Sequence, residues 1–238
     1  MSFGKSSGNR DFGPNAKLYY FKLKTKDLPE PLWEVKQKEG DDLVVVDAAA
    51  KFVDGDIIDI QNKEFQHGKK VIKSVTVTFH DTAAGKNDVY FVTVPHTYLG
   101  RNILNSLLGL KTYGGVQIGL YTSKPKPDPK DPTKMRPGFH SAAVRQGGQL
   151  VYGKFKFEEL PVIPKIKVGA DIFGDDTDIT AFFTTHMEEM RKAVRASLTA
   201  NVPAGAGADG VDTGAEHIDT GAPEDEPEGT APVAPLPF

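Results

Sequence analysis

Alternation of apolar and polar residues with a period of two is the feature that most constrains how this 238-residue chain can fold. It is clearest at residues 71–79 (VIKSVTVTF), where valines alternate with threonines. Residues 52–60 (FVDGDIIDI) precede this run and residues 89–94 (VYFVTV) follow it, and a polar turn separates each of them from it. Successive side chains of a β-strand point to opposite faces, so the three runs predict an antiparallel meander. Gly55 inside the first run predicts a bend or bulge.

The period changes after this meander. In residues 99–110 (LGRNILNSLLGL) the apolar positions recur every three or four residues, which predicts a short helix. A fourth strand is predicted at 116–121 and a fifth at 150–157, with a Lys/Pro-rich loop between them. An aromatic-rich strand is predicted at 17–24, and 27–42, which contains two prolines, is expected to be a connection.

Five strands with a helix between the third and the fourth is the order of the oligonucleotide-binding barrel (OB fold). The sequence therefore predicts a mainly β protein built on a five-stranded OB-fold barrel, with an additional N-terminal strand and a C-terminal helix. Sandwiches and other small barrels have compatible strand orders. The predicted organisation is a flexible N-terminus at 1–16, the barrel domain at 17–170, an amphipathic helix at 171–199 and a disordered acidic tail at 200–238.

Charge is divided unevenly between the tail and the rest of the chain. Residues 201–238 contain eight acids and no Lys or Arg, which leaves 29 basic and 24 acidic residues before them, a formal balance of +5. Such asymmetry is typical of a body that binds a polyanion and a tail that competes with it or recruits partners. A tail that only solubilises the protein is the alternative.

The chain contains no cysteine, which excludes disulfides and Cys-ligated zinc and fits a reducing compartment. Its N-terminus lacks the apolar region of a signal peptide, and no stretch approaches the roughly 18 apolar residues of a membrane span. We therefore expect a soluble protein that is not exported and has no membrane partner, and we expect no cofactor.

Cations and aromatic residues gather in the loops and strand that such a barrel uses for binding. Bases stack on exposed rings, while ammonium and guanidinium groups contact phosphates. Most aromatic residues are expected in the core, and a Lys/Pro loop is often only solvated. The residues expected to bind nucleic acid are Lys63, Phe65, Lys69, Lys70, Tyr121, Lys124, Lys126, Arg136, Arg145, Tyr152, Lys154 and Lys156.

Signals for catalysis are weak. Asp54 and Asp56 share a face of a strand and invite a metal-dependent nuclease hypothesis, but no histidine or glycine pattern completes a metal motif. The segment HMEEM at 186–190 lacks the second histidine of the HExxH zinc signature. We therefore expect no metal site and no enzymatic activity.

These segments together resemble a known family. The run FVDGDIIDIQNKEFQHGKKVIKSVTVTFHD, followed by DVYFVTVPHTYLGRNILNSLLGL, VQIGLY and QLVYGKFKFEELP, resembles the single-stranded-DNA-binding proteins of tailed bacteriophages over roughly residues 17–165. The resemblance implies a sequence-tolerant DNA-binding protein that acts in replication, recombination or repair in the cytoplasm of an infected bacterium. A structural or assembly protein that uses the barrel and tail for protein contacts is the alternative.

The end of the tail resembles the C-terminal tip of bacterial single-strand-binding proteins, which recruits replication and repair proteins. Pro237 and Phe238 are therefore the expected partner-binding residues, with the terminal ring and carboxylate held by a partner pocket. In this chain TAPVAPLP separates the acids at 224–228 from the last residue, whereas in the bacterial tip the acids adjoin the end. The charge division also suggests that the tail competes with DNA for the basic body.

Overall fold

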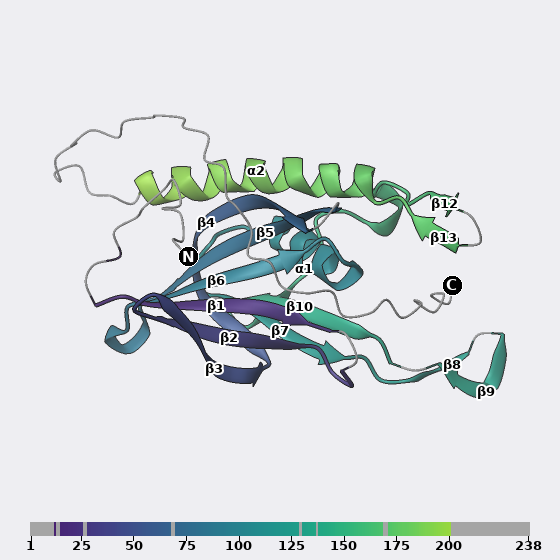
Figure 1. The fold of residues 1–238 in the computed structure, drawn as a ribbon, viewed down its shortest axis with the longest axis horizontal. Helices are drawn as coiled ribbons and strands as arrows, with labels where there is room; N and C mark the ends of the chain where they lie inside the picture. Colours follow the sequence, from purple (N-terminus) through teal and green to yellow (C-terminus); the bar gives the residue numbers. More distant parts are fainter. Residues whose placement is uncertain are drawn as a thin grey trace.

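The computed structural model describes residues 12, 15–25, 28–67, 70–128, 130–136, 138–168 and 171–200, with backbone alone at 65–67, 70, 84, 132, 166–168 and 171–173. The protein is mainly β, with a large mixed sheet of nine strands and two α-helices (Figure 1). Neither helix is both long and apolar enough to cross a membrane, among the residues just given.

The predicted meander is confirmed. It consists of β4 (Phe52–His67), β5 (Lys70–Asp81) and β6 (Asp88–Pro95), paired in antiparallel order. The apolar phase of the alternation faces the core, where Val75 and Val77 are fully buried. The centre of the sheet therefore consists of three strands that follow one another in the chain.

β4 bends at Gly55 and so belongs to two pairings. Its first residues, from Phe52 to Gly55, pair with β7 (Val116–Thr122), and its remainder pairs with β5. Gly55 has φ +151°, and a Cβ there would lie 3.0 Å from the carbonyl oxygen of His80. A residue with a side chain is strained in this backbone region, so the glycine permits the predicted bend.

Three N-terminal strands extend the sheet beyond β6. β1 (Lys17–Lys24) lies parallel to β6, followed by β2 (Leu32–Glu39) and β3 (Asp42–Ala50). The expectation that 27–42 is a connection was wrong, because the alternation resumes after the second proline. In β2 the side chains of Trp33 and Val35 are buried, while the residues between and after them are more accessible.

The other side of the sheet continues from β7 to β10 (His140–Gln146) and β11 (Gln149–Val151). Between β7 and β10 in the chain, β8 (Lys126–Asp128) and β9 (Asp131–Arg136) form a separate two-stranded hairpin. A second such hairpin, of β12 (Lys165–Val168) and β13 (Asp171–Gly174), precedes the last helix. Both hairpins project from the same end of the molecule in Figure 1. Two short 3-10 turns occupy Ala83–Gly85 and Phe157–Glu159.

The fifth strand predicted at 150–157 was wrong beyond Val151, where β11 ends. The chain leaves the sheet because it crosses the first helix at close range. A Cβ on Gly153 would overlap the side-chain amide of Asn105, and one on Gly109 would overlap the carbonyl oxygen of Tyr152. Strand alternation therefore does not determine which side chains of 152–156 are exposed.

The five-stranded OB-fold barrel is not confirmed. The described strands follow the order β11-β10-β7-β4-β5-β6-β1-β2-β3, and the sheet does not close on itself. β1 occupies the place beside β6, in parallel orientation.

Both predicted helices are present, but the second begins at Thr177 and not at 171, because residues 171–174 form β13. α1 (Tyr98–Leu108) begins after Thr97, whose side chain accepts a hydrogen bond from the N–H of Gly100, and it buries Ile103 and Leu104. α2 (Thr177–Ala200) lies along β4 and buries the face that includes Phe183 and Met187 (Figure 1). The core thus lies between the sheet and the two helices.

Candidate nucleic-acid interface

The outer face of β4, β7 and β10 carries two exposed aromatic rings. Strand register places Phe52 of β4 opposite Gly119 of β7, which in turn lies opposite Ala143 of β10. Tyr121 follows two residues after Gly119 and so points to the same face. Phe52 is 57% exposed and Tyr121 is 46% exposed. The two rings therefore lie diagonally across neighbouring strands, beside the small residues Gly119 and Ala143.

A second cross-strand row adds polar groups to this face. Asp54, Gln117 and Arg145 lie side by side on β4, β7 and β10, and Leu150 of β11 lies opposite Arg145. Arg145 and Leu150 are both exposed. The face thus combines rings for stacking, an amide and a cation.

A third exposed ring lies just beyond the β7–β10 pair. The N–H of Ser123 donates to the carbonyl oxygen of Phe139 (2.9 Å), and the N–H of Phe139 donates to Oγ of Ser123 (2.9 Å). These bonds fix Phe139, which is 53% exposed, at the base of the β8–β9 hairpin. We call Phe52, Tyr121, Phe139 and Arg145 the ring face.

The β8–β9 hairpin supplies cations next to the ring face. Lys124 precedes it and Lys126 begins it, and both are exposed. Arg136 is different, because its guanidinium lies 3.0 Å from the carboxylate of Asp128. This guanidinium lowers the pKa of Asp128, and the pair fastens the hairpin. Lys124 and Lys126 are therefore better placed than Arg136 to contact a phosphate.

The segment 152–157 presents further rings and lysines on a fixed backbone. The side-chain amide of Asn105 donates to the carbonyl oxygen of Phe155 (2.9 Å) and accepts from its N–H (3.0 Å). Tyr152 is 78% exposed and Phe157 is 83% exposed. Lys154 Nζ lies 5.3 Å from the centroid of the Phe155 ring, a cation–π distance, and Lys156 is exposed.

The tip of the β4–β5 hairpin contributes less to the interface. Lys63 lies on β4, and desolvation by the surrounding protein lowers the pKa of its ammonium group. The side chains of Phe65 and Lys70 lie outside the described part of the structure, as does Lys69 entirely. Pro237 and Phe238 also lie outside the described residues.

The sequence-based candidates therefore divide into groups. Tyr121 and Arg145 share the ring face, Lys124 and Lys126 adjoin it, and the three candidates of segment 152–156 are exposed although no strand aligns them. Phe52 and Phe139 were missed. Phe52 could have been found, because it falls in phase with Asp54 on the polar side of the β4 alternation.

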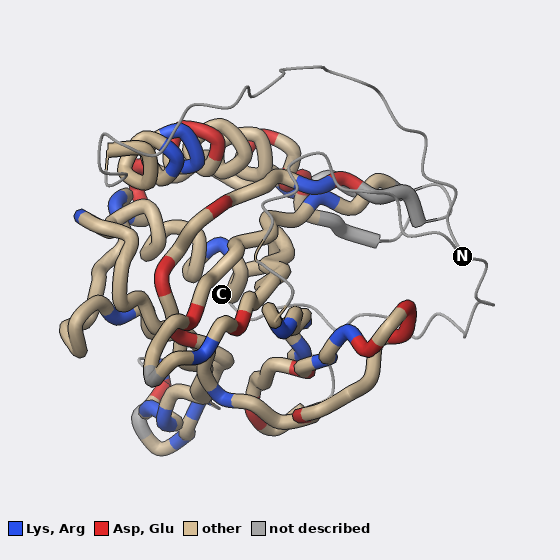
Figure 2. Tube along the Cα trace, turned by 90° about the vertical axis from the view of Figure 1, so that its left-hand side faces the viewer, with Lys and Arg blue, Asp and Glu red and all other residues tan. Residues whose placement is uncertain are grey.

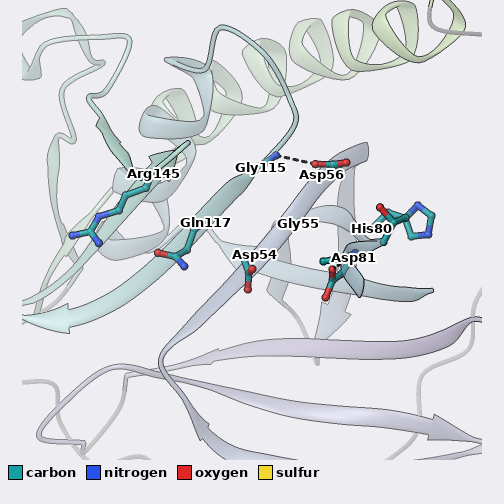
Figure 3. A pocket seen from close by; sticks show the side chains of 11 residues that line it. Asp54, Gly55, Asp56, His80, Asp81, Gly115, Gln117 and Arg145 are labelled. Carbon is teal, nitrogen blue, oxygen red and sulfur yellow. Dashed lines mark hydrogen bonds between the residues drawn. The ribbon is translucent and has the colours of Figure 1, made fainter. Parts of the chain in front are cut away.

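A cavity of about 370 Å³ opens where β4 bends, beside the ring face (Figure 3). Its polar lining includes Asp54, Asp56, Asp81, Gln117 and Arg145. One oxygen of Asp56 accepts a hydrogen bond from the N–H of Gly115 (2.8 Å), while Asp81 is bound by Lys86 (3.2 Å) and by the hydroxyl of Tyr90 (3.0 Å). Burial would raise the pKa of Asp81, but hydrogen bonds from the N–H of Ala83 and from Lys86 and Tyr90 outweigh it, and the pKa is lowered.

Positively and negatively charged residues are mixed along the described trace. Figure 2 shows Lys and Arg segments interspersed with Asp and Glu segments in that view. Binding of a polyanion would thus depend on local cations beside exposed rings rather than on a uniformly positive surface.

In the part of the chain that the structure describes, no group of three or more His, Asp or Glu side chains is arranged to hold a metal ion. No protein family, curated protein or solved structure matches this chain.

Proposed function

We propose that this protein binds single-stranded DNA with little dependence on sequence and without catalysing a reaction. The observation that carries the proposal is the ring face, where Phe52, Tyr121 and Phe139 are each about half exposed on paired or hydrogen-bonded backbone. Every base has a π-face, so exposed rings bind unpaired bases regardless of sequence. Duplex DNA keeps its bases stacked internally and cannot use these rings.

Phosphates are contacted by the cations around the ring face. Arg145 lies on it, Lys124 and Lys126 adjoin it, and Lys154 and Lys156 lie on the segment after β11. Cations that neutralise phosphates release counterions, so affinity should fall as the salt concentration rises.

We infer that the core is a modified OB fold. In its favour, the meander β4-β5-β6 is followed by α1 and then by β7, which pairs in antiparallel orientation with the start of β4. β1 pairs with β6 in parallel orientation, and this is the position that the last strand of an OB barrel would occupy. In an OB fold the loop after the fourth strand contacts nucleic acid, and here that position holds the β8–β9 hairpin.

The biological role that we propose is in DNA replication, recombination or repair of a bacteriophage, inside the infected bacterial cell. The acidic tail, with Pro237 and Phe238 at its end, recruits partner proteins of those pathways. The support for this is the resemblance of the sequence and the charge division between body and tail.

The test is titration of the full-length protein against a labelled oligothymidylate and a duplex of equal length, followed by fluorescence anisotropy. We expect binding of the single strand that weakens steeply between low and high salt, and much weaker binding of the duplex. Equal affinity for both forms, or no effect of salt, would contradict the proposal.

A second candidate function is a structural or assembly role, and β3 favours it. Leu43, Val44, Val45 and Val46 are 40–49% exposed on this edge strand. Exposed apolar edge strands are prone to pair with another chain. If gel filtration shows a defined assembly whose elution is unchanged by single-stranded DNA, this second function is the better one.

A further inference from the structure

The cavity begins at Asp54, the next residue on the same face of β4 after the exposed ring of Phe52. Phe52 and Asp54 are two residues apart on the same face of β4, and Gln117 of β7 lies opposite Asp54. Pockets for small ligands occupy about 300–1,000 Å³, and this cavity of about 370 Å³ falls in that range. A base stacked on Phe52 would therefore lie next to the carboxylate of Asp54 and the side-chain amide of Gln117.

Asp54 is an exposed carboxylate whose charge acts on Lys86 and Tyr90 through space. Within the described residues no hydrogen bond or ion pair joins it to another group, unlike Asp56 and Asp81 of the same cavity. In Figure 3 the guanidinium of Arg145 extends away from Asp54 and Asp81. The two carboxylate oxygens of Asp54 are therefore free to accept hydrogen bonds from a ligand. The guanidinium of Arg145 is available for a phosphate.

We propose that this cavity recognises the Watson–Crick edge of one guanine in a bound single strand. Guanine presents two parallel donors, N1–H and the N2 amine, which match the two oxygens of a carboxylate. Cytosine and adenine offer one exocyclic amine, and thymine offers one N–H between two carbonyl oxygens that the carboxylate repels. The inference depends on the proposed function and adds a base preference at one position of an otherwise tolerant site.

The experiment compares oligothymidylates of about 15 nucleotides, within the range of one OB-type site, that carry a single central dG, dC, dA or deoxyinosine. A good bidentate contact discriminates by about 5- to 150-fold. Because this cavity is open to solvent, we expect about 5- to 10-fold tighter binding of the dG oligonucleotide by the full-length protein. Deoxyinosine lacks the N2 amine and should lose most of that gain.

Asp54→Asn is the variant that tests the carboxylate, since it keeps the size and replaces one acceptor by a donor. It should abolish the preference for dG while binding oligothymidylate at least as tightly as the unaltered protein. Asp41→Asn removes the same charge at the β2–β3 turn, which does not line the cavity, and should keep the preference.

The outcomes separate this inference from the proposed function. Equal binding of all oligonucleotides by the unaltered protein, or a dG preference that survives Asp54→Asn, would overturn the base-reading cavity and leave single-strand binding intact. Failure to bind any of the oligonucleotides would overturn both.

Discussion

The side chain of Asn105 on α1 pairs with both backbone polar groups of Phe155, donating to its carbonyl oxygen and accepting from its N–H. This pair of bonds replaces the strand ladder that ends at Val151. It holds the segment with Tyr152, Lys154 and Phe157 against the helix and keeps their side chains exposed.

Asn105→Ala should therefore destabilise the protein by about 1–3 kcal/mol, because two backbone groups lose their partners. Urea denaturation measures the change. Asn102→Ala makes the same substitution at an exposed position of α1 and should stay within about 0.5 kcal/mol of the unaltered protein. Equal losses for the two variants would show that the Asn105 bonds contribute nothing specific.

Removing a ring from the ring face should weaken single-strand binding. Phe52→Ala and Tyr121→Ala should each cost about 1–3 kcal/mol of binding free energy, the usual contribution of one base stacked on one ring. Tyr121→Phe keeps the ring and should bind nearly as well. Tyr98→Ala, which removes an exposed ring from α1, is the matched control, and an effect as large as that of Tyr121→Ala would argue against a defined face.

Cations of the hairpin region should determine part of the salt dependence. For single strands the slope of log affinity against log salt falls by about 0.7 for each phosphate contact that is lost. The double variant Lys124→Ala/Lys126→Ala should therefore reduce the slope by about 1.4. Lys38→Ala on β2 should leave it unchanged, and an unchanged slope in the double variant would exclude these lysines from the interface.

Docking of α2 should depend on the charge of Asp59. Its carboxylate lies 3.3 Å from Nε of Arg195 and 3.4 Å from Nε of Arg191. Burial alone would raise the pKa of Asp59, but hydrogen bonds from Gln61 and Arg195 outweigh it, and the pKa is lowered. A lowered pKa adds stability that is fully present above the ordinary value near 4 and is lost as the pH falls through the folded-state value.

Asp59→Asn should accordingly cost about 1–3 kcal/mol at pH 7 and pH 5, as expected for an ion pair that is only partly buried. The difference from the unaltered protein should shrink below about pH 4, as this carboxylate is protonated first in the unfolded chain and then, at lower pH, in the folded protein. Urea denaturation at three pH values tests this. A difference that stays constant down to pH 2 would mean that the charge of Asp59 does not hold the helix.

The bend of β4 should depend on Gly55. Gly55→Ala places a side chain in a strained backbone region and against the carbonyl oxygen of His80, so we expect a loss of about 1–3 kcal/mol in unfolding free energy. Gly119→Ala, on the neighbouring β7, has space for a Cβ and should be nearly neutral for stability. Similar stability of both variants would show that the bend tolerates other residues.

Local patterns allowed the central elements to be predicted from sequence, whereas pairings between distant segments were not predictable. Alternation in β5 and the helical period in α1 depend on residues close together in the chain, and both were found. The parallel pairing of Lys17 with Asp88, by contrast, leaves no local signal. The strand at 32–39 was missed because the prolines before it suggested a connection, although its buried Trp33 and Val35 keep the alternation.

The candidate site was predicted in part for the same reason. Tyr121 could be identified, since its position at the end of an alternating strand predicts exposure. Phe139 follows an irregular hairpin, and only the hydrogen bonds to Ser123 fix its place. The exposure of Tyr152 was expected on a strand that does not exist, and it results instead from the passage of the chain over α1.

The division of β4 between two partners has a kinetic consequence. The β4–β5 pairing joins neighbouring segments, whereas the β4–β7 pairing joins Phe52 to Gly119 across two other strands and a helix. Closing long loops costs more entropy, so distant pairings tend to form late during folding. A newly made chain would acquire its hairpins first and the complete ring face only at the end of folding.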